Sequence, residues 1–495
     1  MVRDSGARVA RRSLLKATGG LIAATPALAA AQSVAPIAKS IAAQPDLTGR
    51  LARYMALARD QKLPAKVMQD AKHRILDTIG AIISGATLPP GEVTAKYTRA
   101  QGGTAEASVL GTNIRTTATN AAFANGMFAH ADETDDFDPV TKAHPGCVTV
   151  PAALALAELQ NSTGAEFISA VTLGYDLCCR FLKALDADLV RAIYRSAEGT
   201  SATFGAMAAA ASLARFDETR MRYALSYAAQ QTSGLWSWQR DEDHIEKAFD
   251  FSGMGSRNGA QAVTMVQAGF TGVMDVLDGD KNAITALSAK PQPEEMVAEL
   301  GSRFYISETA IKVFSVGYPI QAPLDAFLAL RKEHKLTPGN VKAVVVRLPA
   351  DGAGIVNNSA MPDVNVQHLI AVALIDGTVS FEMSHSRERM DDPAVLAVRS
   401  RVQLIADKSL VDPEAPRSAL VEVTVADGKV VKHFTKYPPG TKENPLDEAT
   451  VNKKVHGLIA PVISAARADT VIERAATLET QKSMRDLIAL MTLRN

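Results

Sequence analysis

The chain has 495 residues, of which 47% are hydrophobic and 21% are charged. This balance is typical of a globular protein and excludes a disordered or fibrous one, and the length predicts two domains or one large domain with a lid. The charges of the 53 basic and 53 acidic residues cancel, so the formal net charge is zero. Nucleic-acid binding and general membrane-surface binding both need a basic face, so the charge balance argues against them. The three cysteines fit no zinc or disulfide framework and are expected to be small buried side chains.

The first 31 residues have the order of parts found in a twin-arginine export signal. Arg11, Arg12 and Lys16 precede a mildly apolar stretch, which ends in small residues around Ala29. A peptidase that accepts only small side chains would cut there. The alternative is an alanine-rich N-terminal helix. We interpret 1–31 as a signal peptide, which predicts a periplasmic protein with no membrane association after the signal is removed.

Helical patterns dominate residues 45–305. Pro64 begins one predicted helix, whose apolar residues recur at helical spacing along one face, and Pro151 is predicted to begin another. The segment from Thr203 to Ala214 is rich in alanine, which allows helix axes to approach closely at the centre of a helical domain.

Residues 306–449 have a different sequence pattern, in which β-rich runs replace part of the helical pattern. Val341 to Leu348, Val402 to Ile405 and two short runs around Asp427-Gly428 are predicted strands, and the last two form a hairpin. A predicted helix, Val366 to Ile375, ends before Gly377. Helical patterns return in 450–495. The predicted fold class is therefore mainly α, with a large all-helical domain and a smaller inserted α/β lid domain.

Four groups of segments follow one another along the chain: 121–136 with His144-Pro-Gly and 151–158; 203–211; 246–251 with 257–259 and 267–272; and Ile311-Lys312 with 324–326, 373–377 and 440–446. In this order and spacing they resemble the MmgE/PrpD family, whose members include 2-methylcitrate dehydratase and cis-aconitate decarboxylase. The resemblance spans nearly all of the chain after the signal. It implies a helical domain, an α/β lid, a cleft between them, homodimers, no cofactor, and a small carboxylic acid as substrate.

The resemblance assigns chemistry to individual residues. His144 matches the family's active-site histidine, and a histidine can carry a proton near neutral pH. Lys247 matches a family lysine that would bind a substrate carboxylate as a point charge. Arg257 is a weaker candidate for the same task. The structural alternatives are a loop histidine bonded to backbone and a solvated surface lysine.

An acidic run precedes His144. The family carries Asp-x-Asp-Asp-Thr here, and in this chain Glu133 takes the first acidic position, Asp135 and Asp136 match, and Phe137 replaces the threonine. Glu133 is predicted to face the cleft and orient a histidine or bind a substrate hydroxyl, and Asp135 to bind substrate or brace the loop. His130 is predicted to be a packed helix histidine. The spacing fits no known metal motif, so no metal is predicted.

Three expected family positions are changed. Ser196 and Gln321 stand where the family has histidines, and His368 stands where it has a tyrosine. Gln321 cannot transfer a proton as an imidazole does, although it can bond a carboxylate. His368 is predicted to supply a proton carrier from the lid.

The sequence therefore predicts an exported, cofactor-independent lyase that abstracts a proton next to a carboxylate. The alternatives are an isomerase or epimerase on the same fold, a periplasmic carboxylate-binding protein without catalysis, and a metal-dependent hydrolase built on the acidic run.

Overall fold

The computed structural model describes residues 46–493. The predicted export signal, residues 1–31, lies outside the described residues. The described part of the chain is mainly α-helical, as the sequence predicts, with one four-stranded sheet and one pair of two-residue strands. No helix within 46–493 is both long and apolar enough to cross a membrane.

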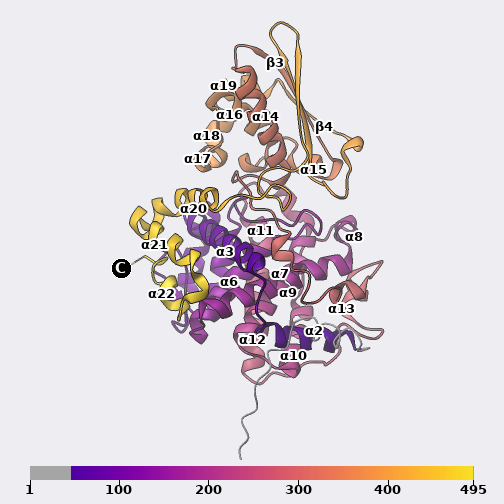
Figure 1. The fold of residues 1–495 in the computed structure, drawn as a ribbon, viewed down its shortest axis with the longest axis vertical. Helices are drawn as coiled ribbons and strands as arrows, with labels where there is room; N and C mark the ends of the chain where they lie inside the picture. Colours follow the sequence, from indigo (N-terminus) through magenta and orange to yellow (C-terminus); the bar gives the residue numbers. More distant parts are fainter. Residues whose placement is uncertain (1–45, 494–495) are drawn as a thin grey trace, which may run out of the picture. The chain divides into compact units, whose positions relative to one another are not determined.

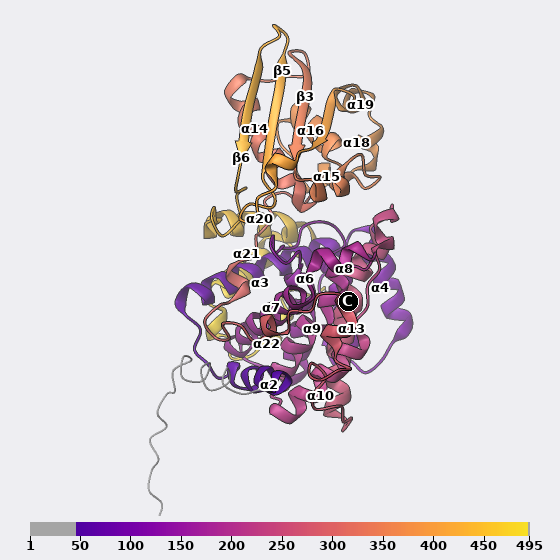
Figure 2. The same cartoon turned by 90° about the vertical axis from the view of Figure 1, so that its right-hand side faces the viewer.

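The first hydrophobic core is formed by helices from both ends of the described chain (Figures 1 and 2). Its residues run from Leu47 to Ile311 and again from Val451 to Met491. The C-terminal helices return to this core, where α20 packs against α3. The elements are α2 (Leu47–Ala58), α3 (Ala65–Gly85), α4 (Pro89–Gln101), β1 (Ala107–Ser108), β2 (Arg115–Thr116), α5 (Ala118–Ala129), α6 (Pro145–Gln160), α7 (Gly164–Leu185), α8 (Ala187–Ala192), α9 (Ala197–Leu213), α10 (Glu218–Gln231), α11 (Ile245–Ala248), α12 (Met254–Gln267), α13 (Ala283–Leu287), α20 (Glu448–Ile463), α21 (Ala465–Ala476) and α22 (Met484–Ile488).

Helix α9 is the centre of this core. Every one of its residues is buried, and it packs against α6, α7 and α12. Small side chains let these helices approach closely: a Cβ on Gly205 would lie 3.0 Å from the carbonyl oxygen of Gly174 on α7. The alanine-rich run therefore serves helix packing, as the sequence predicts.

The start of α6 differs from the prediction. The helix begins at Pro145, and Pro151 lies inside it rather than at its start. A proline within a helix has no N–H to give to the carbonyl four residues earlier. Here that carbonyl, of Cys147, accepts a hydrogen bond of 2.5 Å from the Ser252 hydroxyl, and the Ser256 hydroxyl donates to the next carbonyl, of Val148, at 3.1 Å. Two serines of a neighbouring segment thus allow the helix to continue through Pro151.

The second hydrophobic core, with residues from Val316 to Val431, combines the four-stranded sheet with helices. The strand order is β4-β3-β5-β6, with β3 and β4 parallel and the other pairs antiparallel. The predicted strands and the Asp427-Gly428 hairpin are confirmed, and Gly428 has the positive φ of 90° that the turn requires. The elements are α14 (Gln321–His334), β3 (Val341–Leu348), α15 (Ala350–Val356), α16 (Val366–Asp376), α17 (Phe381–His385), α18 (Arg387–Asp391), α19 (Pro393–Arg399), β4 (Val402–Ala406), β5 (Ala419–Val425) and β6 (Val430–Thr435).

The sheet is covered by helices on one side. Burial alternates along β5, so alternate side chains face the core. Helix α14 packs against β5 and β6 (Figure 2), while α16 packs against β4. Helix α16 ends at Gly377, as predicted, and this glycine has a φ of 81°.

We predict that Gly259→Ala destabilises the protein by about 1–3 kcal/mol, because the added methyl group overpacks the contact of α12 with α9. A Cβ at this position would lie 2.4 Å from the backbone nitrogen of Met207. Gly457→Ala is the matched control, since it is exposed on α20 with nothing within 4 Å of its Cβ. It should stabilise by about 0.5–1 kcal/mol. Urea unfolding measures both, and equal midpoints for the two variants would contradict the packing account.

Candidate active site

The acidic run lies between the end of α5 and the start of α6, and all of its acids are buried. Three of them brace the segment by accepting backbone N–H groups. Asp132 accepts from Thr134 at 3.1 Å, Asp136 from Gly146 at 2.9 Å, and Asp138 from Val140 at 3.1 Å. Glu133 and Asp135 are left to make contacts with side chains from other parts of the chain.

Asp135 bonds two imidazoles. One carboxylate oxygen is 3.0 Å from Nδ1 of His130, and the other is 2.8 Å from Nδ1 of His144. Burial alone would raise the pKa of Asp135, but His130, Lys312 and His144 outweigh it and hold this pKa well below its usual range. Asp135 is therefore an anion. It fixes the ring of His144 and leaves Nε2 as the ring nitrogen available to a ligand.

Two buried lysines neutralise the two acids. Lys312 Nζ is 3.0 Å from Glu133 and 3.2 Å from Asp135, and Lys247 forms an ion pair with the other oxygen of Glu133. All four side chains are at most 4% exposed. Removing one partner of a buried ion pair leaves an uncompensated charge and typically costs about 3–5 kcal/mol. We call Glu133, Asp135, Lys247 and Lys312 the charge array.

A short backbone bridge places Lys312 in the charge array. The N–H of Phe137 donates to Ala310 at 3.1 Å, and the N–H of Ala310 donates back to Phe137 at 2.8 Å. The acidic run is thereby paired with the segment that joins the two cores. Lys312 follows Ala310 by two residues, just as Asp135 precedes Phe137 by two, so the pairing brings both side chains together.

Lys247 lies on α11, which continues through one π-helical turn, Phe249–Gly253, into α12. Its Nζ sits 5.2 Å from the ring centres of both Trp238 and Phe251. Burial lowers the pKa of Lys247 to about 7, from an ordinary value of 10.5. This lysine can therefore exist in both protonation states near neutral pH, a property that is common at functional sites.

A cavity of about 40 Å³ lies beside these groups. The part of the chain before residue 300 contributes Glu133, Phe137, His144, Arg191, Glu198, Trp238, Lys247 and Phe251, and the remainder comes from Gly317, Tyr318, Pro319, Ile355, Val364 and Arg417. The second group belongs to the second core or to segments next to it in sequence. This volume holds a few water molecules, so a carboxylic acid requires the cavity to widen.

The structure brings His144, Lys247, Glu133 and Asp135 together, with two changes of role. Asp135 rather than Glu133 orients the histidine, and both oxygens of Asp135 are used, so it is not placed to bind substrate. Glu133 instead pairs with the two lysines. His130 packs beside the loop as predicted, stacked on Phe251 at a centroid distance of 4.5 Å.

Gln321 and His368 do not line the cavity. The Gln321 amide accepts from the N–H groups of Val313 and Phe314 and donates to the carbonyls of Phe314 and Val316, so it holds the segment that carries Tyr318. His368 is fully buried within the second core. Burial lowers its pKa to about 4, and Arg399 and Arg389 add to the effect. It is a neutral core residue.

Ser196 and Arg257 are also elsewhere. Ser196 caps α9 by accepting a 3.0 Å hydrogen bond from Gly199, which explains a serine at this position without a substrate. Arg257 bonds the side chain of Asn258 and lines a separate cavity together with Val93.

The sequence prediction missed Lys312, Tyr318 and Arg417 as site residues. Lys312 lies in one of the segments that resemble the family. Its position between two apolar residues, Ile311 and Val313, could have indicated a buried charge. Tyr318 and Arg417 carry no such sign, because only the fold brings them to His144.

Two groups of three potential metal ligands occur within the described residues: His130, Glu133 and His244, and His130, Asp135 and His144. In each group the ligand atoms lie within 4.8 Å of one another. Both carboxylates, however, already contact the ammonium groups of Lys312 or Lys247. These positive charges would repel a metal cation, so the donor set suits an ion-pair array better than a metal centre.

The chain is similar along most of its length to three proteins named for cis-aconitate decarboxylation. It is 24% identical to the cis-aconitate decarboxylase-like protein oryM of Aspergillus oryzae, covering 90% of this chain and 97% of that protein. It is 22% identical to the cis-aconitate decarboxylase of Aspergillus terreus (91% and 96% covered) and 25% identical to that of Homo sapiens (87% and 91% covered).

The family models give the same result. The MmgE/PrpD N-terminal domain matches residues 49–296 and the MmgE/PrpD C-terminal domain matches residues 314–480. Together the two matches cover most of both hydrophobic cores, and the segment between them, 297–313, includes Lys312. The chain belongs to the MmgE/PrpD family.

Proposed function

We propose that the protein is a lyase that moves a proton at a carbon next to a carboxylate of a small carboxylic acid, without a cofactor. One observation carries this proposal: His144, fixed by Asp135 at 2.8 Å, faces the same small cavity as Lys247. A proton carrier and a cation at one cavity are what such a reaction needs. The names of the relatives support the same class of reaction.

His144 is the proposed acid/base. Its Nδ1 is held by the buried Asp135 carboxylate, which stabilises the imidazolium formed when Nε2 takes up a proton. Lys247 is the proposed anchor for the substrate carboxylate, because its ammonium group also opposes negative charge that develops at the reacting carbon. Arg417, which lines the same cavity, is placed to hold a second polar group.

These groups can account for the proton and electron movements of both dehydration and decarboxylation. In dehydration, His144 takes the proton, the electrons of the C–H bond form the new double bond, and the hydroxyl group leaves the neighbouring carbon as water with a proton from the site. In decarboxylation, the electrons of the C–CO₂ bond stay on carbon, which then receives a proton from His144. The second core would act as a lid that keeps bulk water away from either step.

The charges at the cavity favour a substrate with fewer than three carboxylates. Lys247, Arg191 and Arg417 each already have an acidic partner, namely Glu133, Glu198 and Asp351. Gln321 and Ser196, which replace family histidines, add no charge. We therefore propose that 2-methylcitrate and cis-aconitate are poor substrates and that a smaller or less charged acid is turned over.

An epimerase is the second candidate, since inverting a carbon centre needs two proton carriers. The cavity offers His144 and Lys247, and the lowered pKa of Lys247, about 7, suits a second acid/base. A homodimer is proposed from the family alone.

We predict that the wild-type protein exchanges deuterium into a small di- or monocarboxylic acid in D₂O at the carbon next to the carboxylate. NMR on a panel of acids measures this and detects any dehydration or decarboxylation. His144→Ala should lower the rate by about a hundred- to ten-thousandfold, because one acid/base group is lost. Arg257→Ala, outside the cavity, is the control and should keep the rate. Equal rates for His144→Ala and Arg257→Ala would contradict the assignment, and binding without exchange by the wild type would favour a carboxylate-binding protein.

We also propose that the protein is periplasmic and exported by the twin-arginine pathway, on the pattern of Arg11, Arg12 and the residues that follow. Arg11→Lys with Arg12→Lys should retain the protein in the cytoplasm, because the export machinery recognises the arginine pair. Cell fractionation in a host with that pathway measures the effect, and Arg3→Lys with Arg8→Lys is the control. Unchanged periplasmic yield of the Arg11/Arg12 variant would contradict the localisation.

A further inference from the structure

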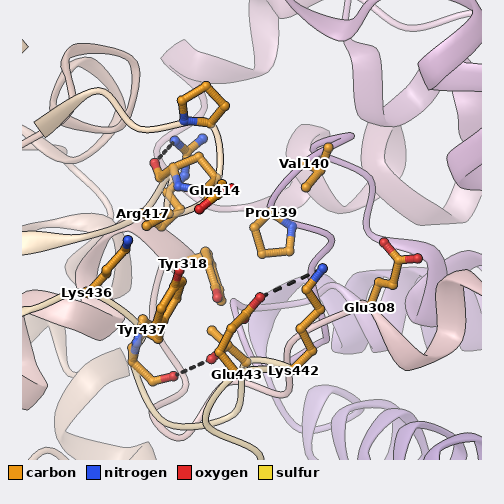
Figure 3. Close-up of a pocket in the computed structure, with 15 residues that line it drawn as sticks. Pro139, Val140, Glu308, Tyr318, Glu414, Arg417, Lys436, Tyr437, Lys442 and Glu443 are labelled. Atoms are coloured by element: carbon orange, nitrogen blue, oxygen red, sulfur yellow. Dashed lines mark hydrogen bonds and ion pairs between the residues drawn. The ribbon is translucent and has the colours of Figure 1, made fainter.

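A second, larger cavity lies beside the catalytic one. Its volume is about 400 Å³, and its walls come from the loop that links the acidic run to His144, from Glu308 and Tyr318, and from segments 413–417 and 436–443. Figure 3 shows Pro139 and Val140 on one side and Glu414 and Arg417 on the other, with Tyr318 near the middle. We call this cavity the vestibule.

The vestibule and the catalytic cavity share two wall residues, Tyr318 and Arg417. Two other cavities, one beside Val93 and one beside Asp363, have no lining residue in common with the catalytic cavity. Movement of the Tyr318 and Arg417 side chains would therefore join the vestibule to the space in front of His144. The combined space is large enough for a small organic acid, whereas the catalytic cavity alone is not.

Tyr318 lines both cavities and has a hydroxyl group that is unpaired within the described residues. It is only 4% exposed, and its hydroxyl has no hydrogen-bond partner among residues 46–493. Its ring centre is 4.5 Å from that of Phe137, which in turn is 5.0 Å from the ring of His144. An unpaired buried hydroxyl is costly, so it is usually explained by a ligand or a functional role. Burial raises the pKa of Tyr318, which keeps the hydroxyl protonated and able to donate to an anion.

Arg417 also lines both cavities. It is 4% exposed and pairs with Asp351 at 2.7 Å, while its Nε has no hydrogen-bond partner in the described chain. At the rim of the vestibule, Lys436 pairs with Asp412 at 3.4 Å and lies 5.2 Å from the ring centre of Tyr437, and Lys442 pairs with Glu443 at 3.8 Å. Such exposed pairs contribute little energy, so both lysines are available to an arriving carboxylate.

We propose that the vestibule is the route by which a small carboxylic acid reaches the catalytic cavity, with Tyr318 as the gate and Arg417 as the residue that receives the carboxylate. Glu308, Glu414 and Glu443 also line the vestibule, and the charges of Lys436, Lys442 and Arg417 balance them, so the walls do not repel an anion. Arg417 Nε would bond the carboxylate in passage, and the Tyr318 hydroxyl, which lines both cavities, would still bond it at the catalytic cavity. This proposal rests on the proposed function, because it takes the ligand class from it.

The chain carries its own reporter for the test. It has two tryptophans, Trp236 and Trp238, and Trp238 lines the catalytic cavity. Stopped-flow tryptophan fluorescence with succinate as the probe therefore follows arrival at the cavity. Val140→Tyr narrows the vestibule at an exposed position, and Val93→Tyr is the matched control at an exposed valine of the other cavity. Excitation where tyrosine does not absorb keeps the signal specific, and circular dichroism checks that both variants are folded.

Val140→Tyr should slow succinate association and dissociation several-fold and leave the Kd nearly unchanged, because obstruction alters a path and not its end states. Val93→Tyr should match the wild type. Tyr318→Phe should weaken binding by about tenfold, since it removes one hydrogen bond to a charged group. Wild-type rates in Val140→Tyr, with succinate still bound, would overturn the vestibule alone. No fluorescence response and no binding of succinate by the wild type would overturn the proposed function as well.

Discussion

The structure depends on the compensation of four buried charges. Glu133 and Asp135 cannot remain ionised away from water without partners, and Lys247 and Lys312 supply them from two distant segments. One lysine lies on α11, and the other lies in the segment that leads into the second core. Pairing these charges therefore joins the acidic run, the helical core and the connection between the cores at one point.

The same array prepares the site chemically. With two acids and two lysines it is formally neutral, and it leaves a fixed carboxylate at His144 Nδ1 without an excess of negative charge to repel an acidic ligand. The aromatic rings of Phe137, Trp238 and Phe251 enclose the cavity and lower the local dielectric constant, so the Lys247 ammonium, although paired with Glu133, interacts strongly with a carboxylate in the cavity. Positioning and electrostatics are thus provided before any ligand arrives.

The sequence was sufficient for the fold class, for the strands of the second core and for the meeting of His144, Lys247, Glu133 and Asp135. The sequence did not predict the features that are determined by tertiary contacts. Pro151 lies inside a helix because serines of another segment satisfy the carbonyls around it. Gln321 and His368 occupy family site positions but turn toward backbone and core. Tyr318 and Arg417 reach the cavity through the packing of the second core, which no local pattern reveals.

The proposed chemistry depends first on the hydrogen bond by which Asp135 fixes the ring of His144. Long-range ¹H–¹⁵N NMR of the imidazole, assigned with His144→Gln, tests it without a substrate. For the neutral ring, we expect a proton on Nδ1 and none on Nε2. Asp135→Asn should abolish this pattern, and Asp136→Asn should preserve it, since Asp136 bonds the N–H of Gly146 instead. A proton on Nε2 in the wild type, or an unchanged pattern in Asp135→Asn, would show that Asp135 does not fix the ring of His144.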